Sequence, residues 1–123
     1  MFKLSKNFLY AVVGASTNKQ KYGYAVLRNL KDRGFSVVGI NPKYSKIDEI
    51  DCFPSLEECP KKIDVVVFVV QPQITLSILE QCLKLQIKKV WFQPGSASTS
   101  AIEFCKKNSI DFVADACIMK SSK

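Results

Sequence analysis

The feature that most constrains the fold is an uninterrupted apolar run over residues 65–70, with the sequence VVVFVV. It is far shorter than the ~20 residues that a helix needs to cross a bilayer. A run with no polar position is typical of a strand that is covered on both faces, as in a parallel sheet between two layers of helices. We therefore expect an α/β fold.

Other strand-like runs alternate with helical segments along the chain. The apolar pattern predicts strands over 8–14, 35–40, 64–70, 88–92 and 110–113. Helical spacing and stop signals predict helices over 22–33, 73–85 and 100–108, and Ser55 to Glu58 has the capping-box spacing of a short helix. The polar segment 43–53 is expected to be irregular and the tail 120–123 to be frayed.

This alternation predicts one doubly wound domain over residues 1–123. Right-handed crossovers leave few topologies, and we expect a five-stranded parallel sheet in the order 3-2-1-4-5. The order would then reverse between the first and fourth strands, and ligands bind at such a reversal.

Composition narrows the function classes. The chain has 18 Lys and Arg against 11 Asp and Glu, a net charge of +7, but no dense basic stripe, so we expect solvated surface charge and no nucleic-acid or membrane partner. It has five cysteines, no Cys-x-x-Cys pair and no histidine. We therefore expect no metal site. Scattered thiols without a secretory signal indicate the reducing cytoplasm.

Small and polar residues follow the first predicted strand. Gly14 lets the backbone approach a ligand closely, and the helix that begins near Tyr22 offers free N–H groups to a phosphate. However, Ser16 and Lys19 stand where the dinucleotide pattern G-x-G-x-x-G has its second and third glycines. An ordinary turn between strand and helix would also explain this loop.

The loop after the second strand is more selective. A site for NAD usually has an acid there, which binds the ribose hydroxyls, whereas this chain has Asn41, Pro42 and Lys43. A lysine would favour a ribose that carries a 2′- or 3′-phosphate. A solvated loop charge is the alternative interpretation of Lys43.

The loops after the third and fourth predicted strands each contain a proline. Pro72 follows the third strand, where it can begin a helix or lie against an adenine. Gln93 follows the fourth strand and is able to hydrogen-bond an amide-bearing ligand, although turn chemistry alone would also explain it.

The loop motifs, taken in order with the segment Cys117 to Met119, resemble those of the small stand-alone CoA-binding proteins and of the CoA-binding domain of the succinyl-CoA synthetase α subunit. The resemblance extends over about residues 8–119. It implies a Rossmann-like fold with CoA in the crevice. The binding residues expected from the loops and the resemblance are Gly14, Ala15, Ser16, Thr17, Lys21, Tyr22, Gly23, Asn41, Pro42, Lys43, Val70, Gln71, Pro72, Gln93, Pro94 and Gly95.

Three functions remain open. The first is a CoA- or acyl-CoA-binding protein without catalytic residues, for which family members and exposed sheet edges are compatible with a homodimer. The second is an NADP-binding or redox-sensing module, and the third is the CoA-binding component of a multi-subunit acyl-CoA ligase. The sequence has no Ser/His/Asp set and no Cys/His pair. Cys117 is either a small buried residue or a thiol near the thiol arm of the ligand.

Overall fold

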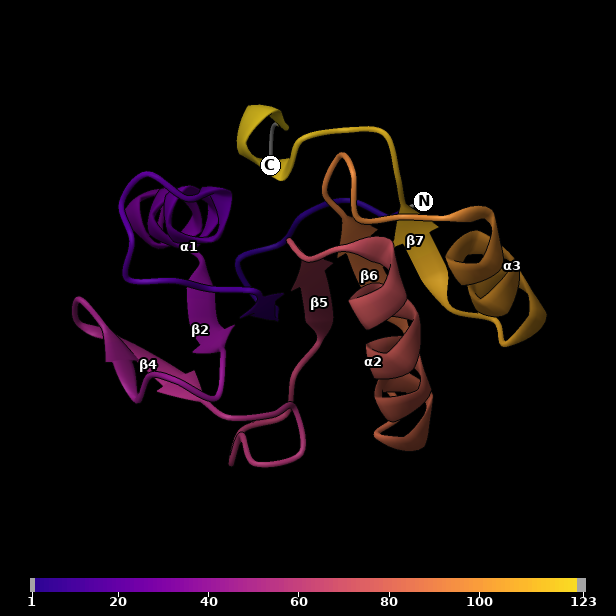
Figure 1. The fold of residues 1–123 in the computed structure, drawn as a ribbon, viewed down its shortest axis with the longest axis horizontal. Coiled ribbons are helices and arrows are strands. Elements are labelled where there is room, and N and C mark those ends of the chain that lie inside the picture. The colour runs from indigo at the N-terminus through magenta and orange to yellow at the C-terminus, as the bar shows by residue number, and fades with distance from the viewer. Residues whose placement is uncertain (1, 122–123) are drawn as a thin grey trace.

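The computed structural model describes residues 2–121 and is shown in Figure 1. Its strands and helices alternate for most of the chain. In order they are β1 (Leu9–Val13), α1 (Tyr22–Asp32), β2 (Ser36–Ile40), β3 (Lys46–Ile47), β4 (Ile50–Phe53), β5 (Val65–Phe68), α2 (Pro72–Lys84), β6 (Lys89–Phe92), α3 (Thr99–Lys107), β7 (Asp111–Val113) and the 3₁₀ helix η1 (Ile118–Lys120).

The strands form one sheet in the order β3-β4-β2-β1-β5-β6-β7, and each neighbouring pair is parallel except β3–β4. The expected α/β, Rossmann-like architecture is therefore confirmed. The expected number and order of strands are wrong, because seven strands are described instead of five and β5 does not lie beside β2.

The error in strand order comes from the segment 43–53, which was expected to be irregular. It contains β3 and β4, and β4 pairs with β2, with Cys52 opposite Gly39. Only alternate residues of this short strand, such as Ile50 and Cys52, are buried, so it has no long periodic pattern. Because β4 occupies the edge of β2, β5 pairs with the other edge of β1. The order therefore reverses between β1 and β5.

Helices cover both faces of the sheet (Figure 1). One buried cluster joins α1 and η1 to residues such as Tyr10 and Val12 of β1, and another joins α2 and α3 to Ala11 and Val13. All four residues of β5 have 0% exposure. The first four residues of the apolar run thus form a strand buried on both faces, as the sequence predicted.

Two local predictions fail near element ends. Residues 55–58 form a turn, closed by the Glu58 N–H to the Ser55 carbonyl at 3.3 Å, because Pro60 cannot continue a helical hydrogen-bond ladder. Helix α3 begins earlier than expected, with Ser98 as N-cap accepting from the Ala101 N–H at 3.1 Å.

The C-terminal segment is more ordered than expected as far as it is described. Arg33 donates to the carbonyls of Ile118 and Ser121 at 3.0 and 2.6 Å. Residues 122 and 123 of the predicted frayed tail lie outside the described residues. No helix within residues 2–121 is long and apolar enough to span a membrane.

Candidate functional site: a cleft at the carboxyl edge of the sheet

The loops after β1, β2, β5 and β6 emerge at one edge of the sheet, because these strands are parallel. The loops after β1 and β5 flank the point where the strand order reverses. In open α/β sheets, ligands bind in the crevice at this position. The structure thus brings all four predicted loops to one edge.

Gly14 and Gly23 hold the start of α1 close to the end of β1. Gly14 has φ +97°, and a Cβ there would lie 2.5 Å from the Val69 carbonyl oxygen. A Cβ on Gly23 would lie only 2.0 Å from the Gly14 carbonyl oxygen. Gly23 therefore permits the close helix–strand contact that the third glycine of a dinucleotide loop usually permits, although Lys19 occupies that position in the sequence pattern.

The first turn of α1 is open to an anion. Lys21 is its N-cap but makes no side-chain capping bond, and the first turn has no acid. Its free N–H groups and the positive end of the helix dipole favour negative charge there. In the preceding loop, Ser16 is buried and accepts the Asn18 N–H at 3.0 Å, whereas Thr17 is exposed.

The loop after β2 docks onto the loop after β1. Asn41 donates its Nδ2 to the Ala15 carbonyl at 2.8 Å, and its Oδ1 accepts the Lys43 N–H at 2.9 Å. The same amide thus fixes both loops. Pro42 and Lys43 are exposed.

Tyr44 makes a second link between these loops that the sequence did not predict. Hydrogen bonds with Thr17 and Ser16 lower the pKa of the Tyr44 hydroxyl, and the charges of Lys43 and Lys21 lower this pKa further. The two lysines therefore lie near one hydroxyl-rich spot. Tyr44 lies in the segment 43–53, which was expected to be irregular, and a single tyrosine there forms no sequence pattern that predicts this role.

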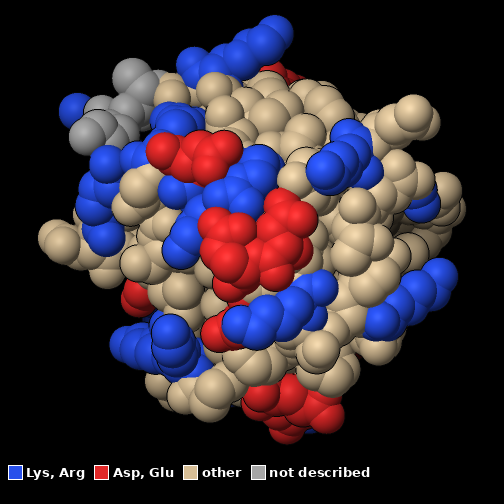
Figure 2. Space-filling view, turned by 90° about the vertical axis from the view of Figure 1, so that its left-hand side faces the viewer, with Lys and Arg blue, Asp and Glu red and all other residues tan. Residues whose placement is uncertain are grey.

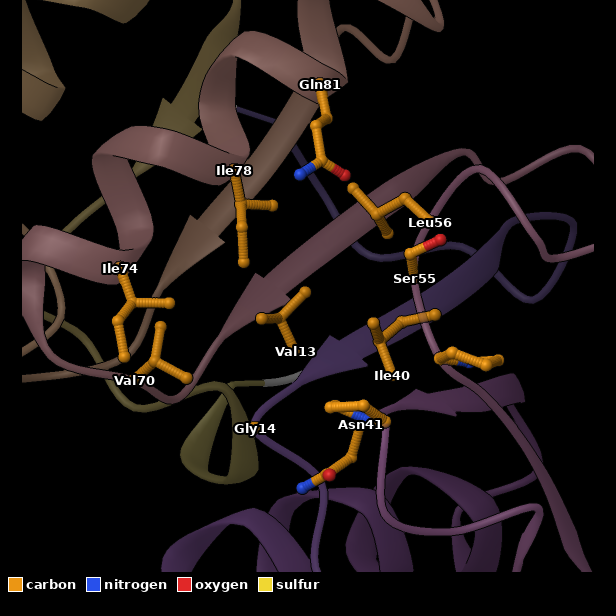
Figure 3. A pocket seen from close by; sticks show the side chains of 12 residues that line it. Val13, Gly14, Ile40, Asn41, Ser55, Leu56, Val70, Ile74, Ile78 and Gln81 are labelled. Carbon is orange, nitrogen blue, oxygen red and sulfur yellow. The ribbon is translucent and has the colours of Figure 1, made fainter.

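An apolar pocket of about 260 Å³ opens beside these loops. Figure 3 shows Ile74 and Ile78 on α2 facing Val13 and Ile40, which end β1 and β2. The pocket residues Ile74 and Ile78 were missed because their spacing also fits a helix core, and Leu56 was missed because it lies in the segment that was expected to form a short helix. Yet Ile74 is 47% exposed. Such a pocket suits a flat, largely apolar group.

A shallower groove of about 390 Å³ continues from this pocket, and Val70 lines both. The other residues that line the groove are Tyr22, Val69, Gln71, Pro94, Gly95 and Ser96. Pro72 lines neither space, and it occupies the first position of α2 without a capping bond from Gln71.

Gln93 lies behind the groove instead of in its wall. It is 1% exposed, donates to the Cys117 Sγ at 3.4 Å and accepts the Ile118 N–H at 2.7 Å. Both ends of its amide thus hold the C-terminal segment. The Tyr22 hydroxyl lies 3.3 Å from the same sulfur, so Cys117 is joined to the start of α1.

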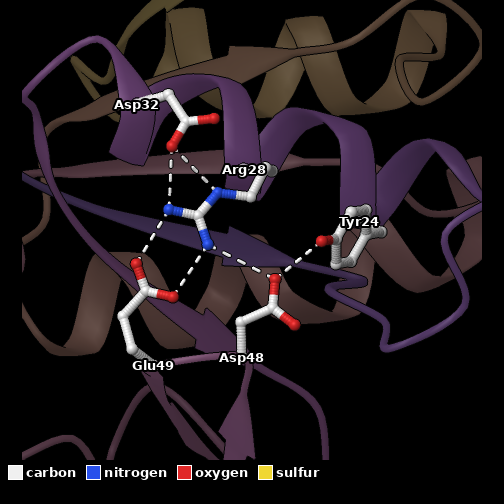
Figure 4. Close-up of polar contacts among 5 residues, drawn as sticks. All are labelled: Tyr24, Arg28, Asp32, Asp48 and Glu49. Atoms are coloured by element: carbon white, nitrogen blue, oxygen red, sulfur yellow. Dashed lines mark hydrogen bonds and ion pairs between the residues drawn. The ribbon is translucent and has the colours of Figure 1, made fainter.

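An ion network fixes the β3–β4 hairpin to α1. Figure 4 shows Arg28 bound to Glu49 through two contacts of 2.8 Å, and to Asp32 and Asp48 at 2.8 and 3.3 Å. Tyr24 donates to Asp48 at 2.6 Å. On this side of the molecule, acidic side chains gather in the middle with Lys and Arg around them (Figure 2). The network braces the hairpin that follows the Asn41 loop.

Within residues 2–121, His, Cys, Asp and Glu side chains form no group of three that could hold a metal ion.

The sequence of this chain matches the model of a known family. The family model described as CoA binding domain matches residues 9–123. The chain belongs to this CoA-binding domain family. The resemblance inferred from the loop motifs is therefore confirmed, although the match does not identify the residues that contact CoA.

Curated relatives include an ADP-forming acetate–CoA ligase of Methanocaldococcus jannaschii, 40% identical over 78 residues, which are 63% of this chain and 11% of the ligase. The chain thus spans about a tenth of the length of that relative. Another is the subunit alpha of the ADP-forming acetate–CoA ligase II of Pyrococcus furiosus, 31% identical over 65% of this chain and 18% of the subunit.

Among solved structures, a conserved hypothetical protein from Pyrococcus furiosus superposes with a TM-score of 0.86 and 39% identity. The match covers 91% of this chain and 97% of that one. This fold thus also occurs in a chain that extends little beyond the matched region.

Proposed function

We propose that this protein binds CoA or acyl-CoA in the cleft, and that residues 1–123 act as one domain that holds the ligand without reacting with its acyl group. The observation that carries the proposal is the junction of the first two loops. There two lysines and the hydroxyl groups of two residues gather around the Tyr44 hydroxyl, and the loop after β2 has no acid for ribose hydroxyls. A phosphorylated ribose fits this junction better than an unmodified one.

The parts of CoA fit successive parts of the cleft. The pyrophosphate would lie at Gly14 to Thr17 and the open first turn of α1. The adenine would enter the apolar pocket between Ile40 and Ile74, and the 3′-phosphate would meet Lys43. The pantetheine arm would follow the groove past Tyr22.

A second function has support from the curated relatives. Two of them are named as ADP-forming acetate–CoA ligases or a subunit of one, and this chain corresponds to a small part of each. The protein would then supply the CoA site of a larger ligase. An NADP site remains a third alternative, because a 2′-phosphate would also attract Lys43.

Calorimetric titration with CoA, dephospho-CoA, NADP and NAD tests the proposal. CoA should bind most tightly, and Lys43→Ala should weaken CoA about fivefold, the effect of one charge-assisted contact, while leaving dephospho-CoA unchanged. Lys84→Ala is the matched control, because Lys84 is exposed at the far end of α2. Equal affinity for CoA and dephospho-CoA would show that the lysine loop does not read the 3′-phosphate.

A further inference from the structure

We propose that the amino edge of the sheet contains a second anion site, which takes a small ligand with two or more phosphate groups. This site lies at the opposite end of the strands from the cleft, because its residues precede or begin β1, β5 and β6, whereas the cleft loops follow these strands. The inference goes beyond the proposed function and does not depend on it.

A pocket of about 330 Å³ opens between three chain segments at this edge. Phe8 lines it from the segment before β1, residues 62–64 line it from the segment before β5, and residues 86–89 line it from the link between α2 and β6. The parallel pairing of β5 with both β1 and β6 brings these segments together. Small-molecule sites occupy about 300 to 1,000 Å³, so the pocket is large enough for a small ligand.

Lysines from two of these segments line the pocket. Lys62 and Lys88 are exposed, and neither forms an ion pair with another described residue. Lys89 is partly buried, and its Nζ lies 5.3 Å from the centre of the Phe8 ring, so a cation–π contact holds this charge at the pocket wall. Lys61 lines a smaller pocket of about 120 Å³, which Lys62 also lines. Four positive charges therefore gather around these adjoining pockets.

The negative contributions at this edge are smaller than the positive ones. Asp64 lines the pocket, but its Oδ2 accepts the Leu9 N–H at 2.8 Å, so the carboxylate is engaged with the backbone. Glu57 lines only the smaller pocket. The C-terminal end of α2 carries about half a negative charge, and Lys84 in its last turn offsets this charge. The four lysines exceed these contributions, and the local net charge favours an anion.

The arrangement of the charges indicates the class of ligand. Lys62 and Lys88 come from separate segments, so a ligand that engages both must carry more than one anionic group. Lysine binds phosphate as a point charge with three donors, and a chain of phosphates repeats its charge at short intervals. The side-chain amide of Gln86 in the same pocket can donate to a further phosphate oxygen. Because the charges surround a pocket and form no stripe, a small polyphosphate fits them better than an extended polymer.

Titration with inorganic triphosphate, followed by backbone amide NMR, tests the proposal. We expect triphosphate to shift the amides of residues 62–64 and 86–89 and to bind more tightly than orthophosphate. The double variant Lys62→Gln with Lys88→Gln should bind triphosphate about 25-fold more weakly, the product of two fivefold charge-assisted contacts. Lys106→Gln with Lys107→Gln is the matched control, because it removes the same charge from the exposed end of α3, outside the pocket.

Two results would overturn the second site: no shift at residues 62–64 and 86–89, even where residues 14–17 of the cleft respond, or equal weakening by the two double variants, which would mean attraction to net charge alone.

A lipid headgroup also presents phosphate, so vesicles of phosphatidylcholine and phosphatidic acid form a separate arm. Retention on these vesicles without binding of free triphosphate would overturn the small-molecule ligand. Titration with CoA tests the proposed function separately, and the Lys62→Gln, Lys88→Gln double variant should bind CoA as the wild type does. If CoA does not bind while triphosphate shifts residues 62–64, the proposed function fails and the second site stands.

Discussion

At the scale of single residues, Gly23 shows how little space separates α1 from the end of β1. Alanine is more favourable than glycine inside a helix by about 1 kcal/mol, so helix propensity alone predicts that Gly23→Ala stabilises α1. The Cβ would however lie 2.0 Å from the Gly14 carbonyl oxygen, and backbone cannot yield as a flexible side chain can. We expect a loss of about 2 kcal/mol in the free energy of unfolding and weaker CoA binding.

Chemical denaturation and titration with CoA measure both effects. Gly34→Ala is the control, because Gly34 lies outside the cleft, a Cβ there meets only the flexible end of Lys6 at 3.2 Å, and its positive φ costs about 1 kcal/mol. If Gly23→Ala is as stable as the wild type, α1 can shift and the close contact is not needed.

The site residues show what sequence can predict at this scale. Gly14 and Asn41 were predicted as loop residues because their types are typical of turns, and the structure gives both a role in holding the loops, while their contact with a ligand stays a prediction. Gln93 was also found, but its amide holds the C-terminal segment instead of lining the groove. Tyr44 was missed, because its role depends on where two distant loops meet.

At the scale of elements, the β3–β4 hairpin is the part of the fold that sequence reasoning lacked. Its tip has Asp48 at φ +53° and depends on Arg28, twenty residues earlier, for its charge partner. Such a contact leaves no periodic signal. The buried strand β5 and the helices α1 and α2 were predicted because their patterns are long and local.

The hairpin also gives a pH prediction. Hydrogen bonds from Arg28 lower the pKa of Glu49 from 4.5 to about 2. A carboxyl whose folded pKa is lowered stabilises the fold fully above pH 4.5 and loses that contribution as pH falls toward 2. We expect Glu49→Gln to lower the denaturation midpoint at pH 7 and to be indistinguishable from the wild type near pH 2.

Denaturation series across this pH range measure the difference between the two proteins. Glu57→Gln is the control, because Glu57 is exposed and takes no part in the Arg28 network. A constant difference between Glu49→Gln and the wild type at every pH would mean that the carboxylate charge does not brace the hairpin.

At the scale of the whole molecule, fold and charge act together. A doubly wound sheet places the loops after its parallel strands at one edge whatever their sequences. A cleft at that edge could therefore be predicted from the sequence. The two strands between which the cleft lies could not be predicted, because β5 pairs with β1 only when β4 occupies the free edge of β2. The net charge of +7 adds a field that attracts a polyanionic ligand.

Thermal stabilisation by bound ligand tests whether the cleft and the positive charge together favour CoA. A ligand present at about 100 times its dissociation constant stabilises the folded state by about 2.7 kcal/mol, which raises the melting temperature of a chain of this size by about 10 °C. We expect that shift with CoA and a smaller one with equal concentrations of dephospho-CoA, NADP and NAD. Added salt should reduce the shift with CoA more than that with dephospho-CoA, because screening weakens each phosphate contact. A larger shift with NADP than with CoA would favour the NADP-binding alternative.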